Sequence, residues 1–294
     1  MNQRSWAIIV AIFIAGIMIF STFASFVMPG GGPPETTTHG AWNPADFGVG
    51  GRLINWDFES IGDSLGMYPE DLVFAFWIDM TASKELTEAA ALSLPPTVGL
   101  TLRDQVNIYP SPIDRVSWGL FADQIAEFHW TKPARIGAQG LAVFYNGYQL
   151  VPIGTTEIFT VLGTPVLFGT EASVKSVLDV VTGAAATTEK FVLPYEETAD
   201  LQISALGREA VDNPGFMPPL GGEYLESYLG VSSSDDGFSL TVKYLALRGE
   251  SERRVEDLAT SLGLETEREG RIATFSGSIG PERLAETLGE FIAP

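Results

Sequence analysis

The tetrapeptide Gly62-Asp63-Ser64-Leu65 is the stretch whose residue types and spacing could do chemistry. A serine hydroxyl becomes a nucleophile for acyl transfer when a histidine takes its proton and an acidic group orients that histidine. The chain contains only two histidines, His39 and His129, and neither lies near the C-terminus. Any serine-based reaction would have to use one of these two imidazoles as its base.

The string matches the tetrapeptide that names the GDSL esterase family. That family's mechanism needs the serine at the end of a hydrophobic strand, exposed to a cleft, and a histidine from an Asp-x-x-His motif near the C-terminus. Residues 55–61 do not form a hydrophobic strand pattern, and Ala126 stands three residues before His129. We therefore predict that the string is a chance match at the end of a short helix and that the chain is not an enzyme.

The remaining histidine and metal patterns are equally weak. His129 lies between Phe128 and Trp130, which favours a hydrogen-bonded histidine in a half-buried strand or turn over a catalytic base. Two histidines without any cysteine cannot close a zinc site unless carboxylates complete it. The sequence 235–237 (Asp-Asp-Gly) lacks the ligand spacing of a calcium loop, and 30–32 (Gly-Gly-Gly) is not followed by Lys-Ser/Thr. We predict no cofactor, no metal and no catalytic site.

Carboxylates are abundant, so a pair acting as acid and base remains open. The clusters are Asp57 with Glu59, Asp79 after an apolar run, and Glu196 with Glu197. Burial of Asp79 at the end of a strand would raise its pKa. A role for Asp79 in capping or in a turn is nevertheless favoured over catalysis, because aspartate commonly bonds the backbone at such positions.

Five tryptophans lie in the first half of the chain beyond residue 40: Trp42, Trp56, Trp77, Trp118 and Trp130. A carbohydrate or partner platform would need these rings exposed. Most of them stand beside other apolar residues, so we expect them to fill the core. Trp42 is the exception, because its neighbours are small or turn-forming.

Residues 6–28 form an apolar stretch without any charged residue. As a helix it would be roughly 34 Å long, enough to cross a hydrocarbon core of about 30 Å. We predict an uncleaved transmembrane signal anchor, because the apolar run is longer than that of a cleaved signal peptide. Arg4 precedes the stretch and the next basic residue is Arg52, which predicts a cytoplasmic N-terminus and an external C-terminal domain.

The composition of the chain limits the compartment in which it can reside and the partners that it can bind. The formal net charge is −20, which argues against nucleic acid and against an anionic membrane surface beyond the anchor. The absence of cysteine excludes disulfides and suggests a prokaryotic envelope. The expected partners are the lipid bilayer through residues 6–28 and envelope proteins, and the oligomeric state stays open.

The predicted organisation is a cytoplasmic N-terminus (1–5), the anchor (6–28), a Gly/Pro/Thr-rich stalk (29–46) and two α+β subdomains (47–183 and 190–294). The predicted fold class is α+β: a mixed, largely antiparallel sheet with helices on one face, in which two ferredoxin-like units could be present. Residues 72–78 predict a strand covered on both faces. Asn146-Gly147 predicts a hairpin.

Further elements follow from caps and periodicity. Helices are expected at 57–65, from Ser83 to Leu92, from Thr170 to Thr182, from Ser251 to Leu262, and from Pro281 onward. Strands are expected at 98–102, 116–121, 141–145, 148–153, 158–162, 166–168, 201–206, 238–247 and 271–277.

Three functions remain in view. The preferred one is a membrane-anchored protein of a prokaryotic envelope with a structural or protein-interaction role. The second is an anchored binding module for a small ligand or polysaccharide, with a concave site lined by tryptophans. The third is an envelope hydrolase with a carboxylate mechanism, which needs two carboxyl groups about 5–9.5 Å apart in a cleft.

Overall fold

The computed structural model describes residues 51–97, 109, 111–122, 124–132, 142–153, 157–207, 210, 222–234 and 237–292. The predicted anchor (6–28), the stalk (29–46), the strand at 98–102 and the residues His39 and Trp42 lie outside the described residues. Among the described helices, none is long and apolar enough to cross a bilayer.

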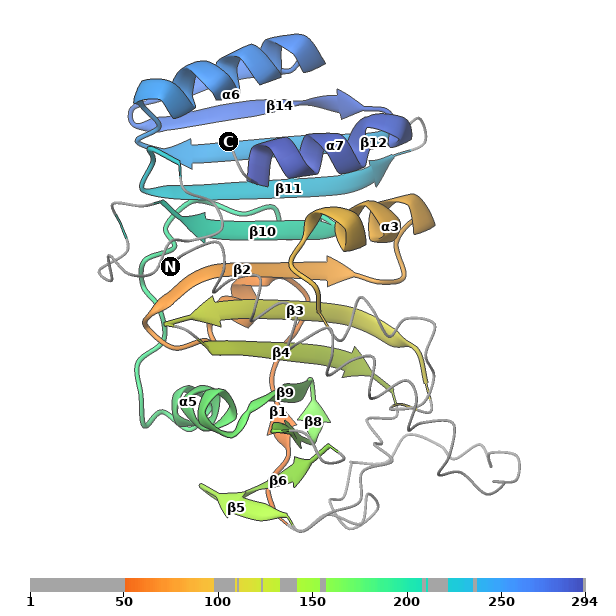
Figure 1. The fold of residues 1–294 in the computed structure, drawn as a ribbon, viewed down its shortest axis with the longest axis vertical. Coiled ribbons are helices and arrows are strands. Elements are labelled where there is room, and N and C mark those ends of the chain that lie inside the picture. The colour runs from red at the N-terminus through yellow and green to blue at the C-terminus, as the bar shows by residue number, and fades with distance from the viewer. Residues whose placement is uncertain are drawn as a thin grey trace.

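The described residues form one large sheet of twelve strands, in the order β13-β14-β12-β11-β10-β2-β3-β4-β9-β7-β6-β5 (Figure 1). Every pairing between neighbours in this sheet is antiparallel. The strands are β2 (Leu72–Asp79), β3 (Ile113–Phe121), β4 (Gln124–Thr131), β5 (Val143–Tyr145), β6 (Tyr148–Pro152), β7 (Ile158–Val161), β9 (Val166–Thr170), β10 (Leu201–Leu206), β11 (Glu226–Ser234), β12 (Gly237–Leu245), β13 (Glu265–Glu269) and β14 (Ile272–Ile279). The short strands β1 (Ile54–Asn55) and β8 (Gly163–Thr164) pair with each other in parallel.

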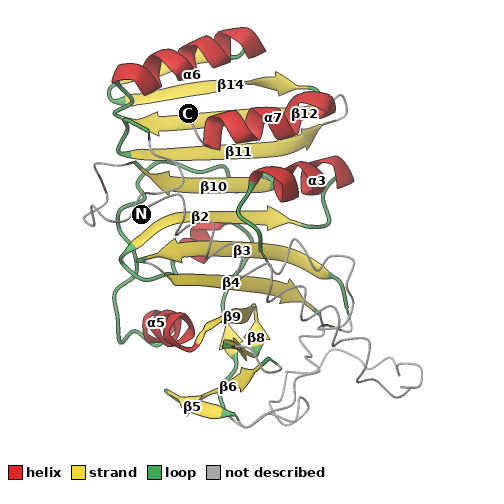
Figure 2. Ribbon diagram, in the orientation of Figure 1, coloured by secondary structure: helices red, strands yellow, loops and turns green. Residues whose placement is uncertain are grey.

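The helices are α2 (Ile61–Leu65), α3 (Lys84–Ser93), α5 (Glu171–Val181), α6 (Gly249–Leu262) and α7 (Pro281–Ile292) (Figure 2). The predicted α+β class with a largely antiparallel sheet is confirmed. Strand β10 belongs to the second predicted range, and it pairs with β2 of the first. The two predicted ranges therefore share one sheet.

Strand β2 separates two apolar layers, as its continuous apolar sequence predicts. Phe74, Phe76 and Ile78 belong to one buried cluster, while Ala75 and Trp77 belong to another. Successive side chains of a strand point to opposite faces, so the two clusters lie on opposite sides of the sheet. We call them the first and the second layer.

The prediction that the helices cover one face is wrong. Helices α3, α6 and α7 place their buried apolar side chains in the first layer. Helices α2 and α5 place Ile61, Val174 and Val177 in the second layer. A strand that is apolar on both faces requires cover on both sides, which is why a single helical layer does not suffice.

Strands β12 and β13 both pair antiparallel with β14, which lies between them. They are therefore parallel to each other, and α6 connects them as in a split βαβ unit. Strands β5, β6, β7 and β9 instead follow one another as antiparallel neighbours, and α5 comes only after β9. The hairpins and helix from β5 to α5 thus have a different connectivity from the C-terminal unit.

Several predicted boundaries are confirmed by their caps. The Ser83 side chain accepts a hydrogen bond from the Leu86 amide at the start of α3, and Thr170 does the same for Ser173 at the start of α5. Pro281 is the first residue of α7. The hairpin at Asn146-Gly147 joins β5 to β6.

The predicted cap of α6 is wrong. The helix begins at Gly249, two residues before Ser251, and the Glu223 carboxylate accepts a hydrogen bond from the Glu250 amide at 2.9 Å. The Ser251 hydroxyl accepts from the Glu223 amide at 2.9 Å. The Glu223 carboxylate, which is distant in sequence, therefore accepts a hydrogen bond from an amide in the first turn of α6. The sequence instead predicts the Ser251 side chain in this role.

Candidate functional site

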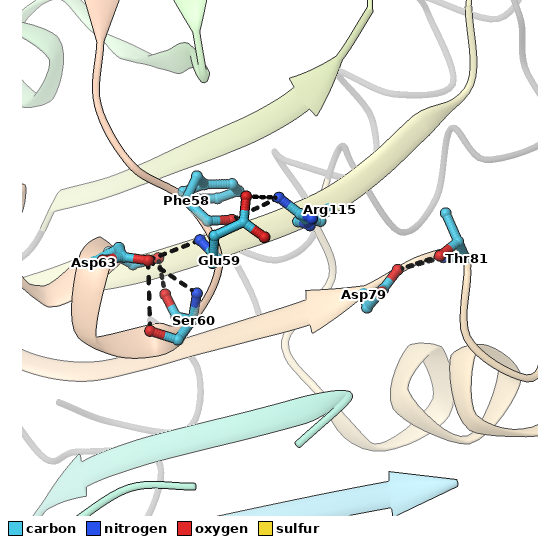
Figure 3. Close-up of polar contacts among 8 residues, drawn as sticks. Phe58, Glu59, Ser60, Asp63, Asp79, Thr81 and Arg115 are labelled. Atoms are coloured by element: carbon cyan, nitrogen blue, oxygen red, sulfur yellow. Dashed lines mark hydrogen bonds and ion pairs between the residues drawn. The ribbon is translucent and has the colours of Figure 1, made fainter. Parts of the chain in front are cut away.

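The Gly62-Asp63-Ser64-Leu65 string lies inside the short helix α2, where its acidic residue closes the first turn (Figure 3). The Asp63 carboxylate accepts hydrogen bonds from the backbone amides of Glu59 at 2.7 Å and Ser60 at 3.1 Å. This is a capping-box arrangement, which supplies acceptors to amides that have no partner within a helix. The expected helix at 57–65 is shorter, because residues 57–60 lead into this cap.

Ser64 is not available to a substrate. Its side chain is 0% exposed, and its hydroxyl donates to the Ser60 carbonyl oxygen at 3.4 Å, one helical turn back. A nucleophilic serine needs access to substrate and a base within hydrogen-bonding distance. These contacts support the interpretation of the Gly62-Asp63-Ser64-Leu65 string as part of a short helix and not as a catalytic motif.

Two of the acidic residues named from the sequence, Glu59 and Asp79, have structural partners in the fold. Glu59 forms an ion pair with Arg115 at 2.7 Å, and Arg115 also donates to the Phe58 carbonyl oxygen at 3.2 Å (Figure 3). Asp79 instead accepts hydrogen bonds from the amide and the hydroxyl of Thr81, at 2.8 and 2.7 Å. Asp79 therefore has the turn role that the sequence favours. Among the described residues, no group of three or more potential metal ligands occurs.

His129 is the centre of a buried chain of hydrogen bonds. Its Nδ1 lies 2.7 Å from the Tyr109 hydroxyl, and its Nε2 lies 3.0 Å from Oε2 of Glu127. With the Glu127 carboxylate as acceptor, Nε2 carries the hydrogen and Nδ1 accepts from the Tyr109 hydroxyl. All three side chains are buried. His129 is therefore hydrogen-bonded within a strand, as predicted, but it is fully buried where a half-buried position was expected.

Strand β4 positions this chain. Glu127 and His129 stand two residues apart, so both project from the same face of the sheet. His129 lies opposite Val116 of β3 and Val166 of β9, and its ring lies 4.8 Å from that of Phe168. Burial, followed by the charge of Glu127, raises the pKa of Tyr109 well above its ordinary value. Tyr109 is thus held as a neutral hydrogen-bond donor, which is a structural role.

Sequence reasoning missed both partners of His129. The spacing Glu127-x-His129 would have placed the two side chains on one face if residues 124–131 had been recognised as a strand. Tyr109 lies 20 residues away, and nothing in the sequence signals this contact.

Glu226 is a second buried acidic residue that the sequence did not single out. It is 2% exposed, and its carboxylate accepts hydrogen bonds from the amides of Val192 at 2.8 Å and Leu193 at 3.0 Å. Desolvation by burial raises the pKa of Glu226 to about 7, although these two amide donors oppose the shift. Glu226 therefore holds the segment 190–197 against the second layer through these hydrogen bonds.

The same segment is held at two further points. The Tyr228 hydroxyl accepts from the Glu196 amide at 2.9 Å, and Lys243 donates to the Pro194 carbonyl oxygen at 2.9 Å. Leu193 lies in the second buried cluster. Glu196 and Glu197 therefore belong to a segment that hydrogen bonds hold against the sheet.

The described tryptophans pack mainly as core residues. Trp77 and Trp118 are buried, and the ring of Trp118 stacks on that of Phe76 at 6.0 Å. Trp56 and Trp130 are partly buried against the second cluster. The indole nitrogens of Trp77 and Trp118 are buried without a hydrogen-bond partner. These rings mainly fill the two layers, as the sequence predicts.

An open hollow of about 380 Å³ lies beside the start of β2. It is lined by Pro69, Glu70, Asp71, Ala185, Ala186 and Lys190. No tryptophan contributes to this hollow, so it does not match the concave site that the binding-module hypothesis requires.

Comparison with known proteins gives distant structural similarity alone. The chain is similar to crystal form III of TP0453, with a TM-score of 0.48 and 12% sequence identity, over 76% of this chain and 97% of that one. Crystal forms I and IV of TP0453 give TM-scores of 0.47 and 0.46 with 11% identity, over 78% and 76% of this chain and 97% and 96% of those chains. No family profile and no curated protein matches the chain, so no enzyme family is found.

Proposed function

We propose that this chain is a single-pass membrane-anchored protein of a prokaryotic envelope with a non-catalytic, structural or protein-interaction role. Its α+β domain lies outside the cytoplasm and is attached through residues 6–28. The observation that carries the non-catalytic role is the buried Ser64, whose hydroxyl bonds a helix carbonyl where a nucleophile would need solvent access.

The other chemistry-bearing side chains support the same conclusion. His129 has both ring nitrogens in hydrogen bonds within a closed layer, Asp79 closes a turn, and Glu59 pairs with Arg115. Each of these groups forms a hydrogen bond or an ion pair within the fold. The side chains that could have done chemistry fix the positions of loops and strands.

The anchoring part of the proposal rests on the sequence of residues 6–28, and the orientation rests on the distribution of basic residues. Arg4 lies before the apolar stretch, and no lysine or arginine follows until Arg52. The net charge of −20 suits a domain that stays solvated.

Protease treatment of intact cells or spheroplasts tests this function. The proposal predicts that the external domain is digested and that a small membrane-protected fragment, from Met1 to about residue 29, survives. Protection of the whole chain until lysis would overturn it. A purified chain that hydrolyses ester or glycan substrates, with activity lost in Ser64→Ala or Glu59→Gln, would overturn the non-catalytic role.

A further inference from the structure

Strand β5 of the β5–β6 hairpin carries two exposed apolar side chains, which point to opposite faces of this edge strand. Val143 is 40% exposed and Phe144 is 63% exposed, and the two are adjacent on β5. Strand β5 is one edge of the described sheet, and β13 is the other. The β13 sequence is Glu-Thr-Glu-Arg-Glu and all five residues are exposed, which is how edge strands in water are usually protected. The β5 edge has no such charge.

Hydrogen bonds hold the hairpin against α5, so the exposure of Val143 and Phe144 is a property of the fold. The Tyr145 hydroxyl donates to both carboxylate oxygens of Asp179 on α5, at 2.9 Å each. The Asn146 side-chain amide donates to the same carboxylate at 2.9 Å. These bonds tie the turn to α5 while Phe144 stays exposed.

The chain enters the described domain beside this hairpin. The Arg52 amide donates to the Gly147 carbonyl oxygen at 2.7 Å, and a Cβ placed on Gly51 would lie 3.5 Å from the Phe144 ring. Residues 1–50, which include the apolar stretch 6–28, precede this point. Only 22 residues, 29–50, separate this stretch from Gly51. The anchor therefore keeps the hairpin close to the bilayer at high effective concentration.

Two cations lie beside aromatic rings of the hairpin, in a chain that is acidic overall. The Arg52 guanidinium lies 5.0 Å from the Tyr148 ring, and the Lys175 amine lies 5.3 Å from the Tyr145 ring. These two cations match the two carboxylates of α5 in the same region, Glu171 and Asp179. In a chain with a net charge of −20, such a patch meets less repulsion from anionic headgroups.

We propose that the β5–β6 hairpin rests on the membrane surface, with Val143 and Phe144 at the interface between headgroups and acyl chains. Apolar and aromatic side chains favour this depth, and a basic residue beside them favours the headgroups. Figure 1 places β5 and β6 at one end of the long axis and α6 at the other, so the domain would stand on the bilayer with α6 farthest from it. This inference rests on the proposed anchoring by residues 6–28.

The absence of cysteine allows single probes to be placed at will. The full chain carrying Val143→Cys, labelled with an environment-sensitive fluorophore, is reconstituted into vesicles of phosphatidylcholine and phosphatidylglycerol that contain nitroxide-labelled lipid. Leu92→Cys, an 80% exposed apolar position on α3, and Ser261→Cys, an exposed position on α6, serve as matched controls. Quenching at residue 143 is expected to exceed that at residues 92 and 261 by at least about threefold. Adding Phe144→Asp to the Val143→Cys chain is expected to remove that excess.

The outcomes separate the inference from the function on which it rests. If the labelled chain does not float with the vesicles after carbonate washing, the anchoring itself fails and the hairpin contact falls with it. If the chain floats but residue 143 is quenched no more than residues 92 and 261, the hairpin contact is overturned and anchoring stands. If quenching at residue 143 survives Phe144→Asp, the assignment of Phe144 to the interface is overturned.

Discussion

The backbone amide of Arg52 donates a 2.7 Å hydrogen bond to the carbonyl oxygen of Gly147. This bond joins the first described residues of the domain to the turn of the β5–β6 hairpin, 95 residues later in the chain. The orientation that we propose for the domain depends on this relationship, because it places Gly51 and Arg52 beside the hairpin.

Asp63 should stabilise the start of helix α2, which is a structural role and not a catalytic one. Asp63→Ala removes the acceptor for the amides of Glu59 and Ser60 and should destabilise the domain by about 1 kcal/mol. Urea denaturation followed by circular dichroism measures this, with Asp71→Ala, an exposed acidic position, as the control. An Asp63→Ala midpoint equal to that of the wild type would contradict the capping role.

The Tyr109–His129–Glu127 chain should act as one energetic unit. Tyr109→Phe removes the hydroxyl that reaches Nδ1 and leaves that nitrogen buried, so we expect a loss of about 1–3 kcal/mol. Because the three residues share one network, Tyr109→Phe and His129→Ala should be non-additive by at least about 0.5 kcal/mol in a double-mutant cycle. Tyr195→Phe, at a partly exposed tyrosine, is the control. Strict additivity of the two substitutions would argue against a connected chain.

Glu226 should make the stability of the fold depend on pH. Its folded pKa is raised from 4.5 to about 7, so the folded state holds a proton that the unfolded state has released between these values. The stabilising contribution is fully present below about pH 4.5, and stability falls as pH rises through 7, by about 3 kcal/mol in total.

Denaturation midpoints measured between pH 4.5 and 8 test this dependence. Glu226→Gln cannot titrate, and it should flatten the decline between these limits. The exposed Glu70→Gln is the matched control and should leave the wild-type slope intact. If Glu226→Gln declined with the wild-type slope, another group would be responsible.

The hydrogen bonds between Asp179 of α5 and the β5–β6 hairpin should be needed to hold β5 in place. Asp179→Ala removes the acceptor of the Tyr145 and Asn146 hydrogen bonds, so the amide protons of β5 should exchange faster with solvent while those of β10 remain unchanged. Hydrogen exchange read by mass spectrometry on peptic peptides measures both regions. Exposed Asp257→Ala on α6 is the control, and equal protection of β5 in both variants would contradict this role.

Elements with local signals were predictable from the sequence. The caps at Ser83 and Thr170, the Asn146-Gly147 turn and the proline at residue 281 each act through neighbouring residues, and each is found where expected. Local hydrogen bonds and backbone preferences determine such features, so a window of a few residues contains the information.

Three strands of the twelve-stranded sheet escaped prediction because their side chains do not show the usual alternation of apolar and polar residues. Strand β4 carries Glu127 and His129 on a buried face, where apolar residues are expected. Strand β11 ends in serines, and β13 holds no apolar residue because it is an exposed edge. Each strand forms through pairing with its neighbours, which the sequence of the strand alone does not report. The buried chain around His129 was missed for the same reason.

Substituted-cysteine labelling of intact cells tests the central claim most directly, that the domain is anchored in the membrane and faces outward. Ser261 on α6 is exposed and is far from the hairpin along the long axis (Figure 1), and the wild-type chain has no cysteine to give background. We predict that Ser261→Cys reacts with a membrane-impermeant maleimide before lysis, with the labelled chain recovered in the carbonate-washed membrane fraction. Labelling only after lysis, or recovery of the chain in the soluble fraction, would contradict the account.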